Sequence, residues 1–379
     1  MQSIVHIILV VVQLVLLLTL SPLVVGLIRK VKARLQCRRG ASLLQPYADL
    51  AKLFRKQPVI SSTTSWIFTA APYIVFASTV AAGLLMPVFV SHTPLNFAGN
   101  IIALVYLLAL GTFFLILAGL DAGSAFGGMG SSREAIVATL AEPAMMLSIL
   151  SIALTAGSTN LSTIVHQSAL MEGVVVAPPA HLMALAALFI VTLAETGRVP
   201  VDNPATHLEL TMIHEAMLLE YSGRYLALME WAAGIKLLVF LTLIVNVFAP
   251  WGIATSLAPS AIAVGLLVYL GKVAALALVI GVIESMFAKL RLFRVPEMLG
   301  AAFILSLLAL VFFYTLKGER GARFDTIGLT TRRSLLGPAA ALLFCHRGAA
   351  SIVGLCGSVC AAVRVSGGDC RARRVSDRT

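Results

Sequence analysis

The chain has 379 residues, of which 59% are hydrophobic and only 12% are charged. Soluble domains carry about 25% charged residues, so the composition excludes an ordinary soluble enzyme and predicts an integral membrane protein. The net charge of +11 does not indicate a nucleic-acid groove, because the basic residues gather in the connections between apolar runs, a pattern typical of membrane topology.

Eight apolar segments are candidate membrane spans. A spanning helix needs about 20 apolar residues, and the absence of strand-like alternation favours helices over a barrel. The first segment is too long for a cleavable signal and runs into Arg29 and Lys30. The sequence therefore predicts an all-α, polytopic membrane protein. In chain order the predicted spans are Ser3–Ile28, Trp66–Val90, Ile101–Leu120, Ala135–Gly157, His181–Ala194, Ala232–Ala249, Pro259–Ile283 and Leu299–Leu316.

The distribution of Lys and Arg predicts the orientation. Up to Leu316, every Lys and Arg outside the spans lies in the first, third, fifth or seventh connection. The positive-inside rule places such connections in the cytoplasm. We therefore expect the N-terminus to lie outside the cell and the protein to cross the membrane eight times.

The first connection contains an amphipathic segment, Leu44–Lys56. Leu44, Tyr47, Leu50 and Phe54 recur at helical spacing, and basic residues flank this stripe. The pattern predicts a helix that lies along the inner membrane interface.

The third connection, Leu120–Ala135, is rich in glycine. No Gly-Lys-Ser/Thr follows the glycines and no strand precedes them, so the phosphate-binding loop of a nucleotide site is not indicated. We expect a compact turn in which Ser131 or Ser132 caps the next helix.

Three charged residues lie inside predicted spans: Glu142, Lys236 and Lys272. A charge at the bilayer centre costs about 2.5–3.5 kcal/mol on insertion scales, so these side chains are expected to face the bundle. One interpretation is a structural ion pair or a lysine that reaches toward the interface. The other is a hydrated polar path, favoured because carboxylates and lysines recur in different spans. Glu195 and Glu284 stand at span ends.

The fifth connection, Glu195–Gly223, concentrates ionisable residues. Asp202-Asn203-Pro204 is a typical helix start, and the predicted helix runs to about Tyr221, with Gly223 as its stop. A metal site on its histidine face has no His-Glu-x-x-His pattern to support it. A solvated acidic loop is a second interpretation, and a segment for proton handling and subunit docking is the one we favour.

The last part of the chain, residues 317–379, is rich in Arg and Cys. It predicts a poorly ordered extension beyond a membrane domain of residues 1–316. A ninth span over Leu335–Val363 is an alternative, although His346 and Arg347 interrupt that segment. Cys356 and Cys360 do not have the spacing of common zinc or cluster motifs.

Four stretches together resemble one known family, the membrane subunit shared by respiratory complex I (its subunit 1) and the group 4 membrane-bound [NiFe] hydrogenases. They follow one another in the family's order and are spread over most of residues 1–316. The stretches are ARLQCRRGASLLQPYADLAKLFRKQ, SREAIVATLAEP, ETGRVPVDNPATHLELTMIHEAMLLEYSG and ESMFAKLRLFRVPEMLGAAF.

The fifth connection departs from complex I. Complex I usually has Pro-Phe-Asp and then a tight run of glutamates, whereas here Pro200-Val201-Asp202 is followed by a stretch with histidines at several of those positions. This pattern resembles the hydrogenase-4 component C and formate hydrogenlyase subunit 4 branch. The departure makes quinone binding an open question.

The resemblance implies a non-catalytic core membrane subunit that anchors a redox arm and couples electron transfer to proton or sodium translocation. The alternative is the corresponding membrane subunit of an NADH-quinone oxidoreductase (complex I), forming part of the quinone site. Iron–sulfur clusters and a [NiFe] centre are expected only in partner subunits, with no cofactor or metal in this chain.

The resemblance also assigns residues and partners. The implied proton-path or coupling residues are Glu142, Glu195, Arg198, Asp202, Glu209, Glu215, Glu220, Lys236, Lys272 and Glu284. The implied arm-docking residues are Arg34, Arg38, Arg39, Asp49, Lys52 and Arg133. Expected partners are the lipid bilayer of the cell membrane, antiporter-like membrane subunits, peripheral iron–sulfur and large subunits, and quinone as a further candidate, with no nucleic acid.

Overall fold

A computed structural model describes residues 2–88, 99–170, 179–202, 212–254 and 259–335. The secondary structure there is helical, and an isolated bridge joins Asn100 and Asn160. The helices are α1 (Gln2–Leu35), α2 (Gln45–Phe54), α3 (Trp66–Leu85), α4 (Ile101–Asp121), α5 (Ala125–Ala156), α6 (Leu161–Leu170), α7 (Pro179–Glu195), α8 (His214–Leu218), α9 (Gly223–Phe248), α10 (Pro259–Met286), the 3-10 turn η2 (Leu292–Arg294) and α11 (Val295–Leu335).

The prediction of an all-α, polytopic membrane protein is confirmed. Within the described residues, seven helices are long and apolar enough to cross a membrane, and α7 is a shorter apolar helix. Each of the eight predicted spans coincides with one of these helices. The predicted amphipathic helix is α2, which begins at Gln45 and ends at Phe54.

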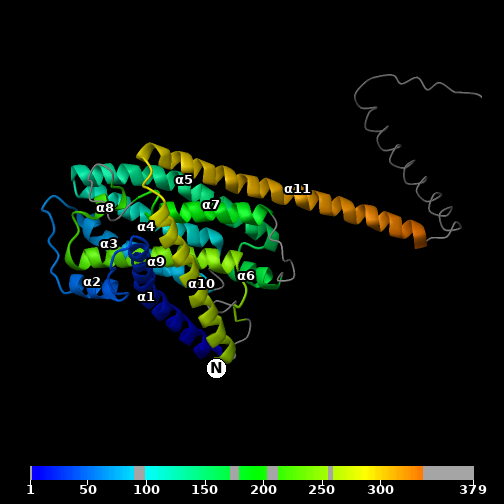
Figure 1. Ribbon diagram of the computed structural model, residues 1–379, viewed down its shortest axis with the longest axis horizontal. Helices are drawn as coiled ribbons and strands as arrows, with labels where there is room; N and C mark the ends of the chain where they lie inside the picture. The colour runs from blue at the N-terminus through cyan, green and yellow to red at the C-terminus, as the bar shows by residue number, and fades with distance from the viewer. Residues whose placement is uncertain (1, 89–98, 171–178, 203–211, 255–258, 336–379) are drawn as a thin grey trace, which may run out of the picture. The chain divides into compact units, whose positions relative to one another are not determined.

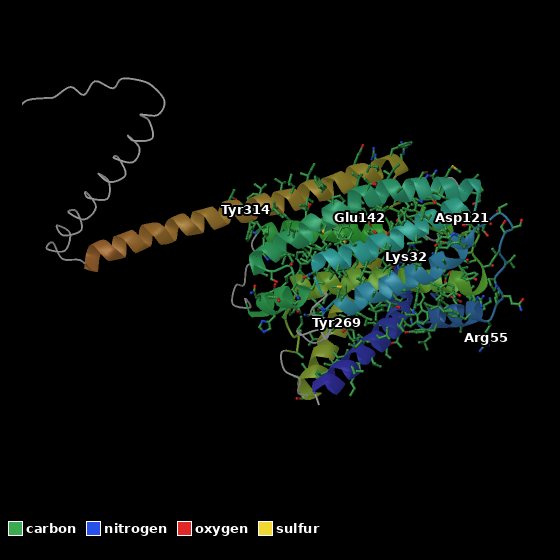
Figure 2. All side chains as sticks on the ribbon, turned by 180° about the vertical axis from the view of Figure 1, so that it is seen from behind. Lys32, Arg55, Asp121, Glu142, Tyr269 and Tyr314 are labelled. Carbon is green, nitrogen blue, oxygen red and sulfur yellow. The ribbon has the colours of Figure 1, made fainter. Side chains whose placement is uncertain are left out.

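The odd-numbered connections lie at one end of the bundle, which we call the charged end. Ser222 donates through its hydroxyl to the carbonyl of Val59, and this links the first connection to the fifth. The backbone N–H of Leu290 donates to the carbonyl of Pro200 over 2.9 Å, and this links the seventh connection to the fifth. Figure 2 shows Arg55 and Asp121, from the first and third connections, at this end.

The even-numbered connections are joined to one another at the opposite end. The N–H of Ile101 donates to the carbonyl of Thr159 over 3.1 Å. Asn246 donates to the carbonyls of Pro87 and Val88, over 2.5 and 2.9 Å, and so satisfies groups just after α3. Successive connections thus lie at opposite ends of the bundle. Eight crossings of the membrane require this arrangement, with α7 counted as one of the crossings.

The helix α9 lies in the middle of the bundle (Figure 1). Every residue from Leu237 to Val247 is buried, and α9 packs against α1, α2, α3, α6, α7 and α10. A helix that is apolar on all sides must be surrounded by protein or lipid. The central position of α9 places Lys236 inside the bundle.

The start of α5 corrects the expected compact turn. The helix begins at Ala125 and its cap is Ser124, whose Oγ accepts from Gly127 over 3.2 Å, whereas Ser131 donates to the carbonyl of Ile116. Gly127, Gly128 and Gly130 belong to the first turns of α5. A Cβ on Gly127 would stand 2.5 Å from the carbonyl oxygen of Gly119, so the glycines permit close packing of α5 on α4.

A short helix, α6, occupies part of the fourth connection. Its apolar residues Leu161, Ile164 and Val165 are fully buried. They have the i, i+3, i+4 spacing of a helix face. Asn160 accepts from the backbone N–H of Ser162 over 3.1 Å. Packing on the bundle thus stabilises a helix too short to be stable alone.

Two neighbouring helices hold the turn of α1 that precedes Pro22. Proline has no N–H, so the carbonyl of Leu18 lacks its usual helical donor. The indole N–H of Trp231 in α9 donates to this carbonyl over 3.2 Å. The hydroxyl of Tyr47 in α2 donates to the carbonyl of Thr19. These bonds fix the amphipathic helix to α1 beside the proline.

The chain divides into two compact units, Met1–Tyr314 and Thr315–Thr379. The first contains all the helices that cross the bundle. In the second, the described residues 315–335 are helical and belong to α11. The helix therefore continues past the predicted end of the last span at Leu316, and the alternative ninth span at Leu335–Val363 lies outside the described residues apart from Leu335.

Candidate functional site

A buried ammonium group lies at the centre of the bundle. Lys236 of α9 stands 2.7 Å from Oε2 of Glu195, at the end of α7, and donates to the hydroxyl of Thr112 in α4 over 3.2 Å. The Glu195 side chain is only 4% exposed. Three helices thus meet around one ion pair, and the other Glu195 oxygen, Oε1, makes no hydrogen bond within the part of the chain described.

Glu142 lies within the length of α5, away from both of its ends (Figure 2). It is half-buried, and its carboxyl is within electrostatic reach of Glu195 and Lys236. Pro143 follows it in the helix and removes one backbone hydrogen bond. Among the described residues Glu142 forms no ion pair, so its charge is balanced only at a distance, by the shared Lys236.

Glu134 and His214 form a second pair. Oε1 of Glu134 in α5 lies 3.2 Å from Nε2 of His214 in α8, and the Glu134 side chain is 1% exposed. Burial alone would lower the pKa of His214, but the Glu134 carboxylate outweighs burial and the pKa is raised. Gly197 (φ +58°) makes room for the ring, since a Cβ there would stand 2.9 Å from Nδ1 of His214.

Asp202 joins the fifth connection to the seventh. Its Oδ1 lies 2.7 Å from Nζ of Lys289. Its Oδ2 accepts from the backbone N–H groups of Ile213 and His214, over 3.1 and 3.3 Å. Asp202 thus caps a helix, but one that begins eleven residues later than expected from the Asp202-Asn203-Pro204 pattern.

The predicted helix from Asp202 to about Tyr221 is wrong in its described part. Met212 and Ile213 are not helical, and α8 covers only His214–Leu218. Gly223 begins α9 instead of ending a helix, and its positive φ of +56° brings it against the carbonyl of Lys56. A Cβ on Gly223 would stand 2.7 Å from that oxygen. The glycine therefore allows the first and fifth connections to pack closely against each other.

Glu284, near the end of α10, binds two basic groups. Its Oε2 lies 3.2 Å from Nζ of Lys32 in α1, and its Oε1 accepts from Nη1 of Arg198 over 3.1 Å. The Glu284 side chain is 2% exposed. This three-residue group fixes the end of α1, the end of α10 and the fifth connection to one another.

Together these contacts form a line of buried charges from the interior of α5 to the charged end. Its acidic members are Glu134, Glu142, Glu195, Asp202 and Glu284, and its basic members are Lys32, Arg198, His214, Lys236 and Lys289. When His214 is protonated the charges balance. Charges held this close together in a low dielectric interact strongly, so a change of charge at one of these groups alters the electrostatic potential at its neighbours.

Some of the coupling residues implied by the resemblance are not in this line. Lys272 donates to the carbonyls of Ala249 and Trp251, in the α9–α10 connection at the opposite end. Glu215 is half-buried on α8, Glu220 is exposed at the charged end, and Glu209 lies outside the described residues. Their proposed roles stay predictions.

The implied docking residues are mostly on the surface of the charged end. Arg34, Arg38, Arg39 and Lys52 are exposed. Asp49 is half-buried and accepts from Gln45 over 2.9 Å. Arg133 donates to the carbonyl of Met212 over 2.9 Å, so its guanidinium holds the residues before α8. Whether these residues contact a partner stays a prediction.

Reasoning from the sequence missed five members of the site: Lys32, Thr112, Glu134, His214 and Lys289. One signal was available, since Glu134 and Glu142 are eight residues apart on one helix, about two turns. The lysines were interpreted only as topology signals. Among the described residues, no group of three or more His, Cys, Asp and Glu side chains is placed to hold a metal ion.

The fold and the line of charges define a class: an α-helical membrane subunit with buried ionisable groups and no nucleotide motif. A family profile described as "NADH dehydrogenase" matches residues 6–315. The chain belongs to this family, that of complex I subunit 1.

Relatives within the family place it in one branch. The chain is 36% identical to Hydrogenase-4 component C of Escherichia coli (strain K12) over 80% of this chain and 94% of that protein. It is 35% identical to Formate hydrogenlyase subunit 4 of the same organism over 79% and 96%. NADH-ubiquinone oxidoreductase chain 1 of Dictyostelium citrinum is 31% identical over 60% and 70%. The predicted family and branch are confirmed.

A solved structure shares the fold. A chain of the membrane-bound sulfane sulfur reductase, an archaeal respiratory membrane complex, matches 80% of this chain and 99% of its own length with a TM-score of 0.69. The sequence identity is 20%, so this likeness concerns the fold alone.

Proposed function

We propose that the chain is a non-catalytic membrane subunit of a complex similar to hydrogenase-4 and formate hydrogenlyase. It anchors a peripheral redox arm at the charged end and couples electron transfer to proton or sodium translocation through antiporter-like neighbours. The charged end lies on the cytoplasmic side of the cell membrane, and the N-terminus lies on the outer side.

The observation that carries this proposal is the line of buried charges. It connects the surface connections, where an arm can bind, to Glu142 inside a membrane-spanning helix. Buried carboxylates in a bilayer are costly unless they serve a pathway or a pair. Glu142 has no direct ionic partner among the described residues, whereas a purely structural role predicts that it would.

The redox groups belong to partner subunits in this proposal. Iron–sulfur clusters and a [NiFe] centre reside in the peripheral arm, and this chain contributes position and charge. A change of charge at the arm acts on the pair of His214 and Glu134. Lys236, which interacts with both Glu134 and Glu142, passes the electrostatic change on to Glu142.

The experiment replaces Glu142 with Gln in the intact complex. We expect the complex to assemble with its normal subunits while ion translocation linked to electron transfer is strongly reduced, because an amide cannot take up or release a proton. Glu297→Gln is the matched control, since Glu297 is exposed in the first turn of α11 and is not one of the candidate coupling residues. Normal coupled translocation in Glu142→Gln would overturn the proposal.

A further inference from the structure

The connection between α10 and α11 exposes large apolar side chains. Phe293 is 88% exposed, Met286 76% and Phe287 59%. Met286 is the last residue of α10, and the two phenylalanines lie between the helices, at the charged end. Soluble surfaces rarely present apolar residues so openly unless another molecule covers them.

The backbone of this connection is held in place at several points. Leu290 donates its N–H to the carbonyl of Pro200 over 2.9 Å, and Lys289 pairs with Asp202 at 2.7 Å. The turn η2 follows, and Val295 directly after it is 1% exposed. Because its neighbours are fixed to the bundle, Phe293 cannot fold back into the core without breaking these contacts.

The charge around Phe293 is basic. Arg291 and Arg294 flank it, and both are exposed. Lys289 is already paired with Asp202, so these two guanidinium groups are the charges that this surface offers outward. Aromatic and Arg side chains together are typical of the residues that dominate binding energy at protein interfaces.

We propose that residues 286–294 form a docking ridge for a water-soluble protein subunit of the same complex. The partner surface contains an apolar pocket for the Phe293 ring, bordered by Asp or Glu side chains that bind Arg291 and Arg294. This inference rests on the proposed function in one respect, namely that the chain works within a complex that has a peripheral part.

The position of the ridge favours a protein partner over lipid. Its anchors, Pro200 and Asp202, belong to the fifth connection, and Asp202 is 2% exposed beneath it. The ridge therefore folds across the polar end of the bundle, not outward along the lipid-facing sides of α10 and α11. A ridge there also touches the line of charges directly, since Lys289 belongs to both and pairs with Asp202.

The first experiment places a photoreactive phenylalanine analogue at position 293 in the full complex and irradiates it. We expect a crosslink to a non-membrane subunit that co-purifies with the complex. The control is the same analogue at position 113, because Phe113 is 56% exposed in the middle of the spanning helix α4. A crosslink from position 293 only to lipid or to a membrane subunit, or none at all, would overturn the ridge.

The second experiment measures dissociation of the peripheral part from the purified complex. Phe293→Ala should speed dissociation about tenfold, the effect of removing one interface anchor, and Arg291→Glu with Arg294→Glu should do the same with a weaker dependence on salt. Phe113→Ala is the control. Unchanged dissociation in the Phe293 and Arg variants would refute the ridge even if Glu142→Gln abolishes coupling, so the two proposals can fail separately.

Discussion

Replacing Lys236 with Met tests whether the central ion pair is essential to the fold. At 2.7 Å from Glu195, and with an effective dielectric constant of about 20, the attraction is roughly 6 kcal/mol. Desolvation of both ions offsets most of this, but removal of one partner leaves the other buried and unpaired. Such losses cost about 3–5 kcal/mol, and we expect this range for Lys236→Met.

The structure further predicts an asymmetry between the two partners. Lys236 interacts with Glu195, Glu134 and Glu142, so its loss leaves three carboxylates without their shared cation. Glu195→Gln leaves the ammonium with two carboxylates still close to it. We therefore expect Lys236→Met to destabilise more than Glu195→Gln, and the double variant to be more stable than Lys236→Met alone.

The assay is the thermal unfolding of the detergent-purified protein at a fixed scan rate, because large membrane proteins often unfold irreversibly. A loss of 3–5 kcal/mol corresponds to a fall in Tm on the order of 10 °C. Lys52→Met is the control, since Lys52 is exposed on α2. The reasoning is refuted if Lys236→Met unfolds at the wild-type temperature, or if Glu195→Gln is the less stable variant.

Two other predictions concern contacts between helices. The raised pKa of His214 means that its pairing with Glu134 stabilises the fold fully below the ordinary histidine pKa and is lost as pH rises through the raised value. His214→Gln should therefore cost on the order of 1–3 kcal/mol near pH 6 and progressively less as pH rises, and a cost that does not change with pH would contradict the pairing. Asn246→Leu leaves the carbonyls of Pro87 and Val88 without their donor, at a cost of about 1–3 kcal/mol; an unchanged Tm would argue against this bond.

The sequence was sufficient to predict the helices that cross the membrane, because length and hydropathy alone determine which segments can do so. It could not separate the two lysines that lie inside spans. Lys236 and Lys272 both interrupt apolar runs, yet one meets Glu195 and the other reaches the backbone carbonyls of Ala249 and Trp251. Whether a lysine pairs with a carboxylate or with backbone carbonyls depends on which helices pack beside it. The hydropathy pattern of one sequence does not contain that information.

Contacts between residues distant in sequence account for the other differences. Asp202 stands where a helix cap is expected, but it accepts from Ile213 and His214. Glu134 pairs with His214, which is eighty residues away in the sequence. Sequence propensities predict the backbone structure of a residue and its near neighbours. They do not predict contacts such as these, which form between segments that are distant in sequence and meet only in the folded protein.

The two hydrogen bonds from Ile213 and His214 to Asp202 have an evolutionary consequence. They hold the residues on either side of positions 203–211 next to each other, since Asp202 accepts hydrogen bonds from Ile213 and His214. Insertions, deletions or exchanges of His for Glu within this stretch can accumulate while Asp202, Lys289 and His214 keep their positions. Proteins of one family can therefore differ in sequence at positions 203–211 while the contacts of Asp202 with Lys289, Ile213 and His214 stay the same.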